Sequence, residues 1–122
     1  MSFDFKELEE FQKEFKKLSS KFNSLKDDFQ VLKDVLEIDP TGKSIMAWKV
    51  ERISGLWDEV DWEFYKIRRF RCKSHSKNSS DSWIRIIYRY EESSAEIEFK
   101  FIEIFQKSKK PNHDIKRIKK NF

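Results

Sequence analysis

A regular apolar pattern near the start of the chain is the strongest constraint on how it folds. Large apolar residues are separated by alternating steps of three and four positions, which puts them on one side of an α-helix. They are Leu8, Phe11, Phe15, Leu18, Phe22, Leu25, Phe29, Leu32 and Leu36. Serines and an asparagine between 19 and 24 interrupt the run, and Ser24 followed by Asp27 is typical of a helix start. The pattern predicts two helices, about 6–19 and 24–37, in an antiparallel hairpin, or alternatively one continuous coiled coil.

β-forming segments replace the helical pattern after the turn at residues 39–42. Residues 83–90 are rich in Ile, Tyr and Trp, which favours a strand. Residues 97–105 form another alternating segment, after a turn at 91–94. Simple alternation in that segment puts four side chains on one face: Ile97, Phe99, Phe101 and Glu103.

The segment at 64–71 alternates apolar and basic residues. Tyr65 and Ile67 therefore face inward from a predicted strand, and Lys66 and Arg68 share the opposite face. A polar stretch at 74–82 follows and is expected to be a hairpin loop.

These elements predict an α+β fold for a single domain spanning residues 1–122. A small antiparallel sheet, about 47–106, packs against the helical hairpin, about 6–37, in the order β-α-α-β-β-β. The first strand of that order is a short one near residues 2–5. The basic tail, 107–122, has apolar residues at helical spacing and is expected to form a short helix.

Composition excludes several classes of protein. The chain has only two glycines, so it lacks the Gly-rich phosphate loops of common nucleotide-binding folds. The lone Cys72 cannot form an internal disulfide. Its two histidines and one cysteine lie far apart in sequence, so we expect neither a metal site nor a cofactor. No apolar run approaches the ~18 residues of a spanning helix, and no leader peptide is evident, so a cytoplasmic location without membrane contact is expected.

Charge is distributed unevenly along the chain, although the net charge is only +4. Residues 66–77 contain six bases and no acid, and residues 106–122 contain seven bases and one acid. The acids are concentrated in the first 39 residues and in 51–65. Such segregation produces a field that attracts a polyanion, although it is also compatible with ordinary solvated surface.

Three strings in this order resemble the RelE/ParE family of bacterial toxin–antitoxin toxins. They are residues 48–56, 64–71 and 84–91, and they follow a predicted helical hairpin. The resemblance covers most of the chain and implies the RelE-like microbial RNase fold. RelE-type members cleave messenger RNA in the ribosomal A site by metal-free attack of a 2′-OH, and an antitoxin neutralises them.

The resemblance also implies site residues. Lys66 and Arg68 match a pair of bases on one strand of the family, and Arg85 matches the arginine of the next strand. Lys107 stands where RelE has a further arginine, and His113 where relatives have a C-terminal Tyr or His. The surrounding bases are expected to bind RNA: Arg69, Arg71, Lys73 and Lys77.

The residue chemistry is consistent with this assignment. Arginines such as Arg68 and Arg85 donate paired hydrogen bonds to phosphate, and nearby cations lower the pKa of a lysine or histidine that must accept a proton. Simpler explanations fit the same residues. Lys66 and Arg68 can be ordinary solvated bases, Arg85 a structural partner of Glu103 or Glu98, and His113 a surface residue.

Three functions are compatible with the sequence. The first is a ribosome-dependent mRNA endoribonuclease, and the basic set favours it. The second is a ParE-like inhibitor of DNA gyrase that has no catalytic activity. The third is a degenerate member that only binds partners. All three imply a cognate antitoxin and a possible hetero-oligomer with it, and the first implies the ribosome and mRNA as partners.

Overall fold

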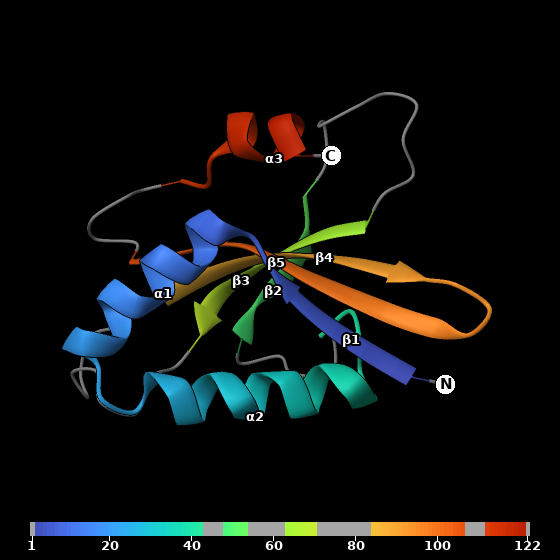
Figure 1. Ribbon diagram of the computed structural model, residues 1–122, viewed down its shortest axis with the longest axis horizontal. Helices are drawn as coiled ribbons and strands as arrows, with labels where there is room; N and C mark the ends of the chain where they lie inside the picture. The colour runs from blue at the N-terminus through green and yellow to red at the C-terminus, as the bar shows by residue number, and fades with distance from the viewer. Residues whose placement is uncertain (1, 43–47, 54–62, 71–83, 107–111, 122) are drawn as a thin grey trace.

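A computed structural model describes residues 2–42, 48–53, 63–70, 84–106 and 112–121 of the chain. Eight elements lie in these ranges, and Figure 1 shows them around one sheet. They are β1 (Ser2–Glu7), α1 (Glu9–Lys21), α2 (Leu25–Ile38), β2 (Val50–Arg52), β3 (Glu63–Phe70), β4 (Ile84–Glu92), β5 (Glu96–Gln106) and α3 (Ile115–Asn121). The α+β class, the two N-terminal helices and the short C-terminal helix are confirmed.

The sheet has the strand order β1-β5-β4-β3-β2 and is mixed. The predicted antiparallel arrangement holds for β2 through β5, whose consecutive strands pair antiparallel. It is wrong for β1, which joins β5 in parallel with Phe5 opposite Phe99. These two rings stack with centroids 5.1 Å apart, so the pairing places β1 by side-chain packing as well as by backbone bonds. The short strand β2 adds one strand to the predicted order.

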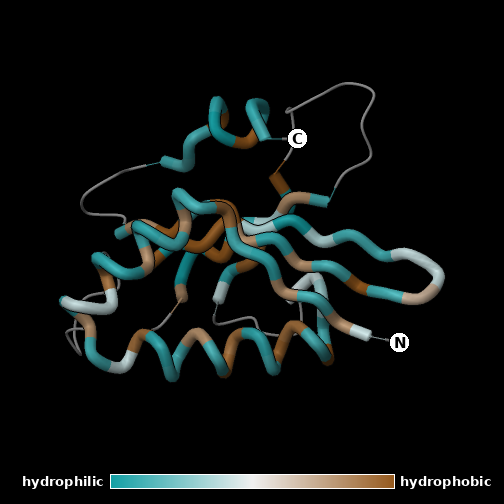
Figure 2. The backbone as a smooth tube through the Cα atoms, viewed as in Figure 1, coloured by the Kyte–Doolittle hydropathy of each residue, from teal (hydrophilic) through white to brown (hydrophobic). Residues whose placement is uncertain are grey.

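Helix α2 covers one face of the sheet, which we call the α2 face. The predicted helical seam points into this core, where Leu25, Leu32 and Leu36 are fully buried. They pack against strand residues that include Tyr88, Phe99 and Phe101. Figure 2 shows hydrophobic positions recurring along α2 and in the central part of the sheet. Burial of this seam, rather than helix propensity, stabilises the helices.

Helix α1 lies along the outer edge of β5, beyond the end of β1. Its backbone follows β1 directly, and the N–H of Leu8 still donates to the carbonyl of Phe101 at 3.0 Å. Phe11 and Phe15 then turn toward α2, where both rings contact Phe29. The hairpin is therefore present, with one helix on the face of the sheet and the other on its edge.

Helix α3 covers the opposite face of the sheet, which we call the α3 face. Ile118 of α3 is buried there with Phe64, Ile87, Ile102 and Phe105. Figure 1 shows α3 and α2 on opposite sides of the sheet. The apolar spacing in the tail correctly predicted this helix, which packs on the sheet through the buried Ile118.

A β-bulge in β5 changes which residues face α3. Tyr88 of β4 stands opposite Phe101, but its neighbour Ile87 stands opposite Glu103, so Ile102 is an extra residue. Simple alternation placed Glu103 on the face of Phe99 and Phe101, and that prediction is wrong. The extra residue turns Glu103 to the α3 face, where it is 1% exposed.

Candidate functional site

Two neighbouring strands bring three predicted bases to the α3 face. Lys66 of β3 pairs in register with Ile87 of β4, and Ile87 belongs to the core beneath α3. Arg85 is two residues from Ile87, and Arg68 forms an ion pair with Glu51, the register partner of Lys66, so both arginines lie on this face. The prediction that Lys66 and Arg68 share one face is therefore confirmed, and Arg85 lies on the same face of the neighbouring strand.

Burial distinguishes Lys66 and Arg85 from ordinary solvated bases. Lys66 and Arg85 are each only 6% exposed, whereas the side chain of Arg68 is 47% exposed. Burial is the main cause that lowers the pKa of Lys66, and the charges of Arg85 and Arg68 add to it. Burial and Arg68 likewise lower the pKa of Arg85. The three bases form a partly desolvated cationic cluster.

The segment before α3 brings His113 into contact with this cluster. Lys66 Nζ lies 3.2 Å from His113 Nδ1 and donates a hydrogen bond of 3.2 Å to Asn112 Oδ1. A charged ammonium has donors only, so Nδ1 then accepts and His113 is a neutral ring with its proton on Nε2. Burial, followed by the charge of Lys66, lowers the pKa of His113.

Two carboxylates that the sequence analysis did not assign to the site balance part of its charge. Glu51 of β2 pairs in register with Lys66, and its Oε2 lies 3.7 Å from Arg68 Nη1. Glu103 accepts a 2.8 Å hydrogen bond from the N–H of Asp114. Glu51 and Glu103 each act electrostatically to raise the pKa of Lys66 and His113. The alternation in 50–52 could have identified Glu51, whereas only the bulge reveals Glu103.

The other predicted residues have different outcomes. Arg69 lies on β3 and is exposed, beside a register shift between Ile67 and Phe70. Four further bases fall outside the described residues: Arg71, Lys73, Lys77 and Lys107. The polar loop at 74–82 also lies outside them. The described site is therefore made by Lys66, Arg68, Arg85 and His113.

This arrangement can bind a phosphate group and transfer a proton beside it. The guanidinium groups of Arg68 and Arg85 can donate hydrogen bonds to phosphate oxygens. Beside them, Lys66 and His113 are two neighbouring groups that can each accept or donate a proton. Among the residues that the structure describes, no group of three or more His, Cys, Asp or Glu could hold a metal ion. No helix within those ranges is long and apolar enough to cross a membrane.

Comparison with known proteins gives no match that would assign a family. No family model matches the chain, and no significant match was found to a curated protein or to a solved structure.

Proposed function

We propose that this chain is the toxin of a type II toxin–antitoxin system and acts as a ribosome-dependent endoribonuclease in the cytoplasm. The observation that carries the proposal is the meeting of Lys66, Arg68 and Arg85 with His113, whose Nδ1 lies 3.2 Å from Lys66 Nζ. A phosphate between two arginines, beside a titratable pair with lowered pKa values, is a suitable place for RNA cleavage.

The proposed reaction is attack of a ribose 2′-oxygen on the adjacent phosphorus. The Lys66–His113 pair takes the 2′-OH proton, the new O–P bond forms, and the P–O5′ bond breaks as the same pair returns a proton to the 5′-oxygen. Arg68 and Arg85 neutralise the charge that develops on the phosphate oxygens. The products are a 2′,3′-cyclic phosphate and a free 5′-hydroxyl.

Lysine and histidine have complementary roles in this scheme. The pKa of His113 is lowered from about 6.5, which favours a neutral imidazole near pH 7 as the base, and Lys66 lies beside it as the second proton-carrying group. Lys107 would add positive charge near the phosphate. Arg69, Arg71, Lys73 and Lys77 would bind ribosomal RNA backbone, and an antitoxin would neutralise the protein by covering its basic surface.

Primer extension on messenger RNA after brief induction of the chain tests this proposal. We expect cuts in phase with codons, lost in Arg85→Ala and in Lys66→Met. Lys26→Ala is the matched control, because Lys26 is exposed on α2, which covers the opposite face. Intact messages together with trapped or cleaved DNA would contradict the nuclease and favour gyrase inhibition. Intact messages and intact DNA would favour a partner-binding role.

A further inference from the structure

The β5 bulge leaves backbone groups that need partners. Pairing with β1 reaches Phe101, where the register ends at Glu7, and no other described strand continues along this edge of β5. Beyond that point the carbonyl of Ile102 and the N–H of Ile104 face α1 and α3. Backbone groups on a covered sheet edge are costly unless another group satisfies them.

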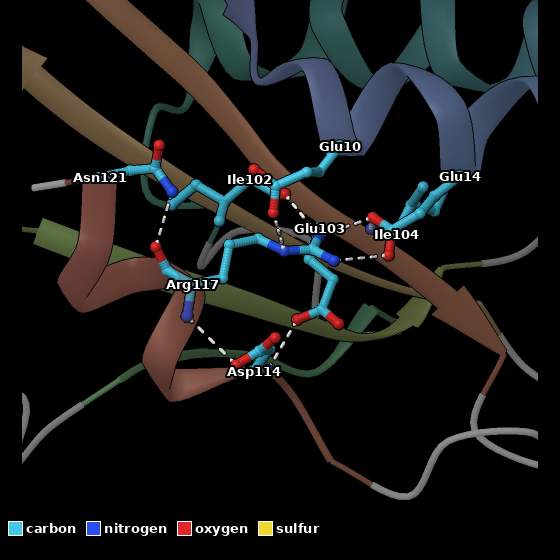
Figure 3. A network of polar contacts seen from close by, with 8 residues as sticks. All are labelled: Glu10, Glu14, Ile102, Glu103, Ile104, Asp114, Arg117 and Asn121. Carbon is cyan, nitrogen blue, oxygen red and sulfur yellow. Dashed lines mark hydrogen bonds and ion pairs between the residues drawn. The ribbon is translucent and has the colours of Figure 1, made fainter.

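An ion pair between α1 and α3 satisfies both groups. Arg117 Nη1 donates to the carbonyl oxygen of Ile102 at 3.1 Å, and Glu14 Oε1 accepts from the N–H of Ile104 at 3.4 Å. The two side chains are joined by bonds of 2.7 Å and 3.0 Å, drawn in Figure 3. Arg117 and Glu14 thus take the place of the interstrand hydrogen bonds that another strand would make on the bulged edge of β5.

Further contacts make Arg117 the anchor of α3. Its Nε lies 3.1 Å from Glu10 Oε2, and its side chain is only 11% exposed. The hydrogen bond with Glu14 is the main cause that raises the pKa of Arg117. A bidentate, charge-assisted pair of this kind is strong and geometrically specific. Helix α3 has only seven residues, so contacts outside the helix must hold it in place.

Hydrogen bonds at the start of α3 connect Arg117 to the segment that carries His113. Asp114 Oδ1 accepts from the N–H of Arg117 at 3.1 Å, as a helix N-cap does, and the N–H of Asp114 donates to Glu103. His113 precedes Asp114 directly. One bulge therefore supplies the carbonyl that binds Arg117 and the carboxylate that binds Asp114 (Figure 3).

We propose that Arg117 is a positioning residue: through Glu14 and the β5 bulge it fixes α3 and thereby places His113 against Lys66. The role in RNA cleavage rests on the proposed function, whereas the placement of His113 rests on the contacts alone. The two are therefore tested by different measurements.

NMR titration of His113 tests the placement. The chain has two histidines, so a His75→Gln variant assigns the two signals. In the wild type, Lys66, Arg85, Glu51 and Glu103 are the charged groups that influence His113, and its pKa lies below the ordinary value of about 6.5. In Arg117→Met we expect this pKa to rise toward about 6.5, because the ring leaves Lys66 for solvent. Lys116→Met removes the same charge from an exposed position of α3 and should leave the pKa unchanged.

Milder variants cover the case in which Arg117→Met does not fold. Glu14→Gln keeps an acceptor for the N–H of Ile104 but loses the negative charge. Arg117→Lys keeps the positive charge but loses the planar guanidinium that makes two hydrogen bonds to Glu14. Both should shift the His113 pKa in the same direction by a smaller amount. An unchanged His113 pKa in the variants that fold would overturn the proposal.

Cleavage kinetics separate this inference from the proposed function. If the wild type cleaves RNA, Arg117→Met should reduce its rate by about 100-fold, as expected for a displaced proton carrier, while Lys116→Met should not. A folded Arg117→Met that cleaves at the wild-type rate would overturn the inference. If the wild type does not cleave RNA, the proposed function is wrong, and the titration alone decides whether Arg117 places His113.

Discussion

Lys66 Nζ and His113 Nδ1 are in direct contact at 3.2 Å, although they are 47 residues apart in the sequence. One is a buried side chain in the middle of β3, and the other precedes the last helix. The contact joins the sheet to the C-terminal segment at the point where the cationic cluster lies. Burial lowers the pKa of both groups, and the charge of Lys66 lowers the pKa of His113 further.

The first prediction concerns the dependence of stability on pH. Because the folded pKa of His113 lies below its unfolded value of about 6.5, the unfolded state binds more protons between those two values. The free energy of unfolding should therefore fall as pH drops from 6.5 through the folded pKa. His113→Gln removes this contribution. Denaturant unfolding at pH 7.5 and at pH 5.5 should therefore show that the variant loses less free energy of unfolding between the two pH values than the wild type does. A loss of free energy of unfolding in the variant that equals or exceeds the wild-type loss would contradict this prediction.

Lys66→Met should separate stability from activity. The buried ammonium lies among like charges, so replacing it by an apolar side chain of similar length should leave the free energy of unfolding unchanged or raise it by about 2 kcal/mol. RNA cleavage should be lost in the same variant. Denaturant unfolding measures the first effect, with Ile67→Ala as the reference for a core loss of about 2–5 kcal/mol. A loss of that size in Lys66→Met would show that the lysine is structural.

Glu51→Gln should tighten RNA binding. The Glu51 carboxylate lies 3.7 Å from Arg68 on an exposed surface, so its ion pair contributes little to stability but competes with phosphate. We expect about two- to five-fold tighter binding of a 2′-O-methyl RNA at low salt, measured by fluorescence anisotropy. Glu37→Gln, an exposed change on α2, controls for net charge. Weaker binding in Glu51→Gln would instead indicate that the carboxylate contacts RNA.

Tyr88→Phe should weaken the fold without altering the site. Tyr88 is fully buried on the α2 face and donates a 3.0 Å hydrogen bond to the carbonyl of Pro40, which fixes the turn after α2. Its loss should lower the free energy of unfolding by about 1 kcal/mol. Tyr90→Phe removes an exposed hydrogen bond to Glu92 and should have a smaller effect. At temperatures well below their unfolding midpoints, both variants should cleave RNA at the unchanged rate.

The elements of this fold were predictable because local patterns specify them. The three-and-four spacing from Leu8 to Leu36 predicted α1 and α2, and period-two alternation put Lys66 and Arg68 on one face. Long-range features were not predictable from such patterns. The parallel pairing of β1 depends on Phe5 meeting Phe99 over a long separation in sequence.

The roles of Glu103 and Arg117 were missed for a similar reason. A bulge is a change of register between two strands, and nothing in residues 97–105 alone indicates that Ile102 is the extra residue. Glu103 was therefore assigned to the wrong face. Arg117 appeared to be one base among seven in the tail, because its partners Glu10 and Glu14 lie on the first helix.

Cleavage of one messenger RNA on programmed ribosomes, with and without a single 2′-deoxy nucleotide at the cut position, tests the central claim most directly. We predict that the purified chain cuts the all-ribose message, leaving a 2′,3′-cyclic phosphate. The message with the single 2′-deoxy nucleotide should stay intact at that position, because the attacking oxygen is missing. Cleavage of both messages at the same position, or of neither, would contradict a site in which Lys66 and His113 activate a ribose 2′-OH.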